Sequence, residues 1–289
     1  MNILKPPALS SHDVVNAARK ILKVKRIGHA GTLDPAAAGV LPLAVGRATA
    51  FLQYLPDDKA YRAQVRFGVA TDSGDETGEV TASCDDFVMP RYDDIKKVLG
   101  EFVGHITQTP PLHSAIKIDG RRAYSLLRHE SDAVMPSREV FIRKISLLDV
   151  CGNTFFIDVE CSKGTYIRSL AMDIGKKFSL PTVMSFLVRT RVGAFNLSNA
   201  YTLEELASAG HELLISPEDY LTQNPHGFGD IPRFQLSPQR EKAFCHGLST
   251  HLRTVLSPRV LVYVGDKFLG LGRFDEDEKA LCPLKIYRI

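Results

Sequence analysis

Apolar residues recur at helical spacing near the start of the chain and at two later places. Between Val14 and Leu22 they repeat every three or four positions, and Ser10 and Ser11 precede them as candidate caps. This pattern predicts an amphipathic helix of about three turns. The same spacing predicts helices over residues 92–103 and 166–178. A T-x-x-E capping box at Thr202 predicts another.

Strand patterns lie between these helices. From Tyr61 to Val69 apolar residues alternate with Arg62, Gln64 and Arg66, which predicts a half-buried strand with one basic, wet face. Residues 138–150 and 154–161 also favour strands through their β-branched and aromatic content, and residues 71–80 favour a turn between strands. Because the order shows no regular strand–helix alternation, the pattern indicates an α+β fold.

The last part of the chain has a different composition. Gly, Pro and Asn cluster in residues 222–233, as in a linker. Beyond it, residues 260–274 predict a hairpin that turns at Gly265-Asp266. From Arg233 onward there are 10 Lys and Arg residues against 6 Asp and Glu residues, so the tail carries the positive excess of the chain.

Composition sets limits on the class of protein. With 289 residues, 44% of them hydrophobic, the chain has enough apolar side chains for a sizeable core. A net charge of +3 permits an acidic partner without requiring one. Five cysteines without a C-x-x-C spacing indicate reduced thiols and disfavour a zinc site. The first 15 residues contain no apolar run fit for a signal peptide, and we expect no membrane-spanning helix.

Common cofactor and hydrolase motifs are missing from the sequence. It has no phosphate-binding loop of the form G-x-x-x-x-G-K-[ST], no H-E-x-x-H and no G-x-S-x-G. The GLG at Gly270 lacks a third glycine and a following helix, which disfavours a dinucleotide site. We therefore expect neither a cofactor nor a metal ion.

The stretch GHAGTLDP, residues 28–35, offers a single carboxylate on a loop. Asp34 has an ordinary structural explanation, since Asp is a good helix N-cap and Pro35 suits the first helical position. Other polar and apolar residues also have ordinary explanations. His29 suits a loop or a core, and Tyr61 suits the first residue of a strand. Tyr166 and Leu187 suit a core, and Arg168 suits a helix surface.

Four segments taken in order resemble the TruB family of tRNA pseudouridine synthases: GHAGTLDPAAAGVLPLAVGRAT, KAYRAQVRFGVATDSGDETG, QTPPLHSAIKIDGRRAY and CSKGTYIRSLAMDIG. The N-terminal LKPP is similar to the Lys-Pro segment of that family, although Ala8 stands where the family usually has Gly. Ala30, Ala50 and the missing Gly in residues 128–130 are further departures.

The resemblance implies a pseudouridine-synthase-type fold with a mixed, mainly antiparallel sheet flanked by helices. It implies a catalytic domain over residues 1–228, with an RNA-gripping insertion at roughly 105–140. A small β-rich PUA-like domain that binds RNA would follow over residues 232–289. Phosphate contacts are expected from the basic strand face and from the tail.

The implied reaction is the isomerisation of uridine 55 in the T loop of tRNA to pseudouridine by base flipping, with no cofactor and no metal. Asp34 would be the nucleophile, Arg168 its ion-pair partner, and Tyr61 a catalytic residue that also stacks on the flipped base. An ionised carboxylate suits the electron-poor ribose C1′, and one carboxylate fits an isomerase better than a glycosidase, which normally uses two.

The remaining substrate-binding residues follow from the same resemblance. Tyr166 would pack near the base, Leu187 would form part of an apolar floor, and His29 would reach into the T loop. The implied enzyme is cytoplasmic, binds the T-arm stem-loop of tRNA, and needs no membrane and no obligate protein partner. Three alternatives remain open: an RNA chaperone without catalysis, a guide-dependent synthase subunit, and a hydrolytic N-glycosidase.

Overall fold

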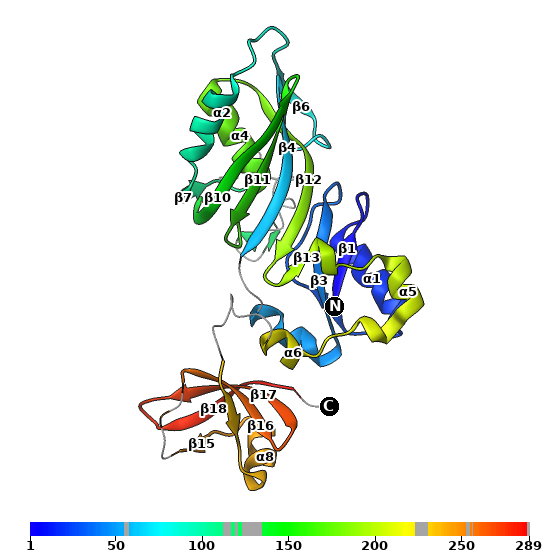
Figure 1. The fold of residues 1–289 in the computed structure, drawn as a ribbon, viewed down its shortest axis with the longest axis vertical. Coiled ribbons are helices and arrows are strands. Elements are labelled where there is room, and N and C mark those ends of the chain that lie inside the picture. The colour runs from blue at the N-terminus through cyan, green and yellow to red at the C-terminus, as the bar shows by residue number, and fades with distance from the viewer. Residues whose placement is uncertain are drawn as a thin grey trace.

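The structure is a computed structural model. It describes residues 1–54, 58–111, 117–118, 121–122, 135–222, 231–252, 255 and 257–287. Two sheets organise these residues, a large one in the first part of the chain and a smaller one after residue 231 (Figure 1). Among the described residues, no helix has the length and apolar character needed to cross a membrane.

The large sheet is mixed but mainly antiparallel. Its spatial order is β1 (Asn2–Lys5), β3 (Ala38–Val45), β12 (Thr182–Val192), β4 (Lys59–Phe67), β11 (Thr154–Cys161), β10 (Arg138–Cys151) and β7 (Gly104–Gln108). β2 (Ile27–His29) pairs with β3, and β13 (Phe195–Asn196) pairs with β12. Only the β12–β3 pair among these is parallel. The alternation read in the sequence is confirmed, since Tyr61, Ala63, Val65 and Phe67 of β4 are buried.

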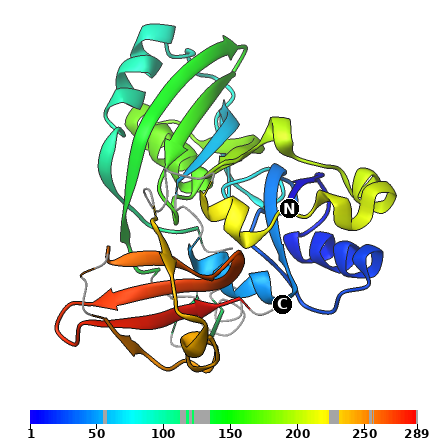
Figure 2. The ribbon, with the colours of Figure 1, turned by 60° about the horizontal axis from the view of Figure 1, so that its bottom comes forward.

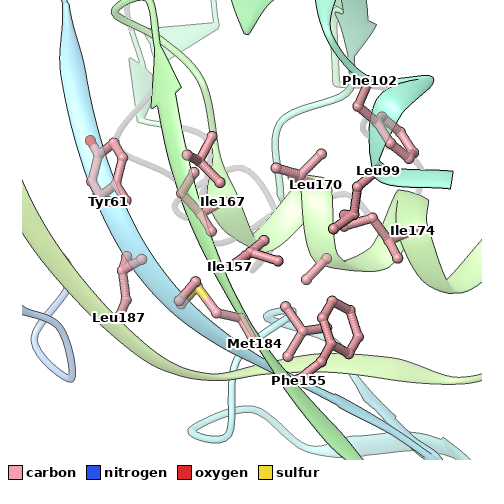
Figure 3. Packing of buried hydrophobic residues seen from close by; sticks show 14 of the residues in the cluster. Tyr61, Leu99, Phe102, Phe155, Ile157, Ile167, Leu170, Ile174, Met184 and Leu187 are labelled. Carbon is pink, nitrogen blue, oxygen red and sulfur yellow. The ribbon is translucent and has the colours of Figure 1, made fainter. Parts of the chain in front are cut away.

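Two apolar clusters attach helices to this sheet. Helices α2 (Tyr92–Gly100) and α4 (Ile167–Phe178) pack on β4, β10 and β11 through residues such as Leu99, Leu170 and Ile174 (Figures 1 and 3). α1 (Ser11–Leu22) and α5 (Leu203–Ala209) share a second cluster with β1 and β3. α1 begins after Ser10, whose side chain accepts a hydrogen bond from the Asp13 N–H, and Thr202 caps α5 in the predicted capping box.

Short elements complete the first part of the chain. β5 (Val69–Thr71) and β6 (Val80–Ser83) form the hairpin predicted around residues 71–80. The 3-10 helices are η1 (Gly46–Tyr54), η2 (Leu197–Asn199) and η3 (Gly210–Leu213), and α6 (Pro217–Thr222) follows them. β8 (Lys117–Ile118) and β9 (Arg121–Arg122) pair with each other. Most of the 105–140 segment around them, and most of the 222–233 linker, lies outside the described residues.

The smaller sheet has the order β14 (Arg233–Gln235), β16 (Arg259–Val264), β17 (Lys267–Asp275), β18 (Ala280–Ile286) and β15 (Thr250–His251), with α8 (Pro238–Cys245) against it. β16 and β17 form the predicted hairpin. Phe51 of η1 and Leu221 of α6 pack against Tyr263 and Phe268 of this sheet, so the two parts share an apolar contact (Figure 2). The Tyr263 hydroxyl donates to Glu218 at 2.6 Å.

The fold class predicted from the sequence is confirmed. The arginines on the solvent-facing side of β4, however, form ion pairs with neighbouring carboxylates. The Arg62 guanidinium forms two 2.8 Å bonds with the Asp158 carboxylate on β11, and Arg66 lies 3.2 Å from Glu76. Neighbouring carboxylates therefore largely neutralise the face that was expected to contact phosphates.

Candidate active site

The loop between β2 and β3 holds Asp34 in a turn that precedes a strand. The Ala37 N–H donates to the Asp34 carbonyl at 3.1 Å, and β3 begins at Ala38. The helix N-cap explanation of Asp34 is therefore wrong, because Pro35 and Ala36 form a turn and β3, not a helix, begins at Ala38. The turn leaves the carboxyl group without a capping role.

Residues near the N-terminus of the chain hold this loop in place through hydrogen bonds. The Ser11 hydroxyl donates to the Leu33 carbonyl at 3.0 Å and accepts from the Leu33 N–H at 2.8 Å. The buried Lys5 ammonium donates to three carbonyl oxygens, one of which belongs to Pro35 at 3.1 Å. The Ala8 N–H also donates to Pro35, from a left-handed conformation with φ 69° that favours glycine. The LKPP segment thus supports the Asp34 loop.

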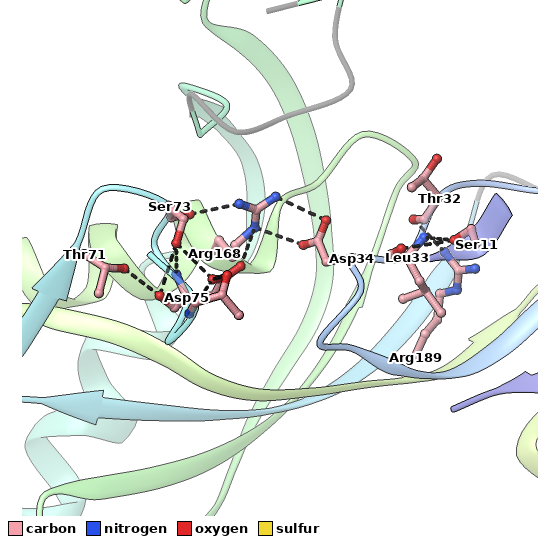
Figure 4. A network of polar contacts seen from close by, with 10 residues as sticks. Ser11, Thr32, Leu33, Asp34, Thr71, Ser73, Asp75, Arg168 and Arg189 are labelled. Carbon is pink, nitrogen blue, oxygen red and sulfur yellow. Dashed lines mark hydrogen bonds and ion pairs between the residues drawn. The ribbon is translucent and has the colours of Figure 1, made fainter. Parts of the chain in front are cut away.

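Arg168, in the first turn of α4, binds the Asp34 carboxylate in a two-point contact. Its Nε lies 3.0 Å from Asp34 Oδ2, and its Nη2 donates to Asp34 Oδ1 at 3.2 Å (Figure 4). The Arg168 side chain is 4% exposed and that of Asp34 is 34% exposed, so the guanidinium is buried while the carboxylate keeps an open side. A planar guanidinium holds a carboxylate in a defined orientation.

A second carboxylate, Asp75, completes this network and was not singled out from the sequence. Asp75 Oδ2 lies 3.7 Å from Arg168 Nε, and Arg168 Nη1 donates to the Ser73 carbonyl at 2.9 Å. The Ser73 hydroxyl and the Thr77 N–H donate to Asp75 Oδ1 (Figure 4). Asp75 lies in the TDSGDETG segment, whose turn propensity gave no sign of a contact with residue 168.

Burial and the neighbouring charges shift the pKa of the Asp34 carboxyl group in opposite directions. Burial raises the pKa of the Asp34 carboxyl above its usual range, the positive charge of Arg168 limits the rise, and the negative charge of Asp75 adds to it. The Arg168 contact is therefore needed to favour the ionised form of a carboxyl group that is partly removed from water.

Asp34 opens onto a cavity of about 260 Å³. Tyr61 of β4 and Leu187 of β12, which are 8% and 7% exposed, form an apolar wall together with Ile167 (Figure 3). The full lining consists of Thr32, Leu33, Asp34, Lys59, Tyr61, Gly164, Thr165, Tyr166, Ile167, Arg168 and Leu187. A cavity with an apolar wall on one side and a fixed ion pair can hold a flat ring system.

Tyr166 borders the same cavity and is tightly held. Its N–H donates to the Gln108 side chain at 3.0 Å, and its carbonyl accepts from that side chain at 3.2 Å. The Arg138 guanidinium lies 4.7 Å from the centre of its ring. The structure thus brings Asp34, Tyr61, Tyr166, Arg168 and Leu187 together around one space, from segments up to 153 positions apart along the chain.

His29 is the predicted site residue that does not line the cavity. It ends β2, a few residues before Asp34, and burial lowers the pKa of its imidazole below the usual range. The neutral form of His29 is therefore favoured at pH 7. Among the described residues, no group of His, Cys, Asp or Glu side chains is arranged to hold a metal ion.

The chain is similar to known proteins. A family model described as TruB family pseudouridylate synthase (N terminal domain) matches residues 19–167. A tRNA pseudouridine synthase B of Symbiobacterium thermophilum is 46% identical over 257 residues, which are 88% of this chain and 83% of that protein. The tRNA pseudouridine synthase B of Microcystis aeruginosa is 40% identical and covers 98% of this chain and 97% of its own length.

The fold has solved counterparts. A structure described as a Cbf5-Nop10-Gar1 complex superposes with a TM-score of 0.67 at 28% identity and covers 94% of this chain and 77% of that chain. The match of the family model over residues 19–167 and the two relatives that span most of the chain show the same family. The chain belongs to the TruB family of pseudouridylate synthases.

Proposed function

We propose that this chain isomerises uridine 55 in the T loop of tRNA to pseudouridine, with Asp34 as the nucleophile and no cofactor. The observation that carries the proposal is the two-point contact between Arg168 and Asp34 in the lining of a cavity that Tyr61 and Leu187 also border. The relatives named tRNA pseudouridine synthase B support tRNA as the substrate class.

The reaction exchanges one bond of the uracil for another. The C1′–N1 bond breaks, the base turns, C1′ bonds to C5, and the C5 proton leaves while N1 gains one, so neither water nor an oxidant is consumed. The carboxylate of Asp34 stabilises the electron-poor centre or bonds to it, at the ribose or at the base. Arg168 keeps the carboxylate ionised and oriented.

A uridine in a folded T loop must leave its stack before C1′ and C5 become accessible. Tyr61 and Leu187 would flank the flipped base, and a base stacked on an aromatic ring gains about 1–3 kcal/mol. Tyr166 would pack near the base, while His29, outside the cavity, would contact the T loop. Tyr61 also offers a hydroxyl group for proton transfer.

The RNA partner is proposed to be the T-arm stem-loop. We divide the chain into a catalytic domain over residues 1–228 and a PUA-like domain over 232–289, with residues 105–140 gripping the RNA. The excess positive charge after Arg233 supports phosphate contacts by the second domain. We propose that the enzyme acts in the cytoplasm, on tRNA, and that it needs no obligate protein partner.

The guide-dependent alternative has one supporting observation, the similarity to a chain solved in a Cbf5-Nop10-Gar1 complex. Identity to that chain is 28%, against 46% to the S. thermophilum relative. Purified protein and a bare T-arm hairpin separate the two functions, because only a self-sufficient enzyme forms pseudouridine without a guide RNA. Release of free uracil would instead indicate an N-glycosidase.

The experiment for the nucleophile is Asp34→Asn, measured as single-turnover pseudouridine yield at saturating enzyme, with mapping of the modified position. The amide keeps the size of the carboxylate but lacks its charge. We expect no detectable product and unchanged tRNA affinity, which also distinguishes an enzyme from an RNA chaperone. A rate within about tenfold of wild type, or roughly 1.4 kcal/mol of barrier, would remove Asp34 from this role.

A further inference from the structure

Positive charge is concentrated in the segment that leads to the proposed nucleophile. Between Asp13 and Asp34 the sequence has no acidic residue, and the next acidic residue after Asp34 is Asp57. Residues 14–56 therefore contain six Lys and Arg residues against a single Asp. Because the whole chain has a net charge of only +3, this segment has a larger positive excess than the protein as a whole.

Four of these cations are exposed within seven positions, where α1 ends and β2 begins. We call this surface the α1-end patch, and its members are Lys20, Lys23, Lys25 and Arg26. Two hydrogen bonds hold the backbone beneath it. Arg19 Nη2, in the last turn of α1, donates to the Ile27 carbonyl of β2 at 3.0 Å. The Arg26 carbonyl accepts from the Gly46 N–H, at the start of η1, at 2.7 Å. The patch therefore lies on a fixed part of the fold.

The four side chains have no carboxylate partner within the part of the chain that the structure describes, and they form no hydrogen bond there. Exposed cations of the two regions expected to contact phosphates are paired instead. Arg62 of β4 pairs with Asp158, and Lys267 of β17 pairs with Glu241. The α1-end patch thus presents positive charge that an anion from another molecule can compensate.

The end of a helix explains only part of this charge. Lys20 lies in the last turn of α1 and Lys23 is its C-cap, where cations interact favourably with the helix dipole. Lys25 and Arg26 lie beyond the cap, and the effect of the dipole falls off within the last turn. Neighbouring like charges also repel one another. A negatively charged partner would explain all four residues.

The place of the patch beside the cavity identifies that partner. Arg26 precedes His29 by three residues, about 10 Å at the usual rise of a strand. The Asp34 loop follows, and Ser11 of α1 holds it through Leu33. β7, where the proposed RNA-gripping segment begins, lies at the opposite end of the large sheet from β1, on which α1 packs (Figure 1). An RNA bound at the cavity therefore has the patch on one side and that segment on the other.

We propose that the α1-end patch binds the phosphate backbone of the T arm of tRNA on the His29 side of the cavity. This inference rests on the proposed function, because it takes tRNA as the substrate. Phosphate contacts fix the position of a nucleic acid without reading its sequence. The patch holds the T arm in place while the uridine leaves its stack.

The test is the affinity of the Lys23→Gln, Lys25→Gln double variant for unmodified tRNA, measured over a range of salt concentrations. Each phosphate contact contributes about 0.7–0.9 to the slope of log K against log salt concentration. Two lost contacts should reduce that slope by about 1.4–1.8, which weakens binding by about 25-fold to 60-fold at about 0.1 M salt. A higher enzyme concentration should recover the lost yield of pseudouridine. A change in slope below about 0.5 would overturn the proposal.

Lys176→Gln, Lys177→Gln is the matched control. These two exposed lysines also lie at the end of a helix, α4, but they pair with Asp173 and Glu101. The control changes the net charge of the protein by the same amount. We expect its slope to change by less than about 0.5 and its affinity to stay within about threefold of wild type. Equal losses in the two double variants would show a general effect of net charge and would overturn the proposal.

Arg26→Gln is a second variant, which leaves the end of α1 unchanged in case the double variant does not fold, as judged by thermal melting. It should reduce the slope by about 0.7–0.9. An unchanged slope in a folded Arg26→Gln protein would contradict the proposal.

A T-arm hairpin, compared with whole tRNA, locates the contact. The double variant should lose the same slope with both RNAs. A loss with whole tRNA alone would overturn the assignment to the T arm, and no loss with either RNA would leave the patch to an acidic protein or an anionic membrane. Wild-type protein that forms no pseudouridine would refute the proposed function, whereas an active wild type with an unchanged slope in the double variant would refute only the role of the patch.

Discussion

The Arg168→Lys variant tests how the carboxylate of Asp34 is controlled. The substitution keeps the positive charge and replaces the planar guanidinium by a single ammonium group. Arg168 now makes two contacts to Asp34, at 3.0 and 3.2 Å, and one to the Ser73 carbonyl, at 2.9 Å. One ammonium nitrogen on a shorter side chain cannot occupy all three positions.

The structure sets the size of the effect. At least one of the two contacts to Asp34 is lost, and a hydrogen bond to a charged group contributes about 1.5–3 kcal/mol. If that contact orients the nucleophile in the transition state, single turnover slows by about tenfold to 150-fold. Affinity for tRNA should change little, because the pair lies at the floor of the cavity.

The assay is the single-turnover rate of pseudouridine formation at saturating enzyme, with tRNA affinity and thermal melting measured in parallel. Arg62→Lys is the matched control, since Arg62 also makes a two-point contact, to Asp158, but with side chains 52% and 39% exposed. Exposed pairs contribute about 0–1 kcal/mol, so this variant should keep its rate. An Arg168→Lys rate within about threefold of wild type and a normal melting curve would refute the reasoning.

Three further predictions concern the same cavity and its support. Tyr61→Leu should slow single turnover more than Tyr61→Phe, because leucine loses the ring as well as the hydroxyl; equal losses would argue against stacking. Burial raises the pKa of Asp34, and the reaction needs the ionised carboxylate. As the pH is lowered, the rate should therefore begin to fall at a pH above about 3.9, the ordinary pKa of an aspartate. A rate that stays constant down to that pH would contradict this. Removing residues 231–289 should weaken tRNA binding and, by uncovering Phe51 and Leu221, lower the melting temperature, while turnover survives at saturating enzyme; lost turnover in a folded remainder contradicts it.

Local patterns in the sequence were enough to predict several helices, strands and turns. The caps at Ser10 and Thr202, the alternation through β4 and the turn at Gly265-Asp266 all appear where they were predicted. Each depends on residues within a few positions of one another, so local hydrogen bonding and the choice of a buried face are enough to decide them. The resemblance carried by GTLDP and KGTYIR added the site residues, which no local pattern could rank above their structural explanations.

Contacts between distant segments of the fold bring these residues together. Asp34 and Asp75 meet Arg168 because the loop before β3, the β5–β6 hairpin and α4 pack around one cavity. The parallel β12–β3 pair buries Arg189 in a strand segment that suggested only core packing at Leu187. Such contacts join positions far apart in the chain, and their free energy comes from long-range packing and the satisfaction of buried charge. A local window of sequence contains neither quantity.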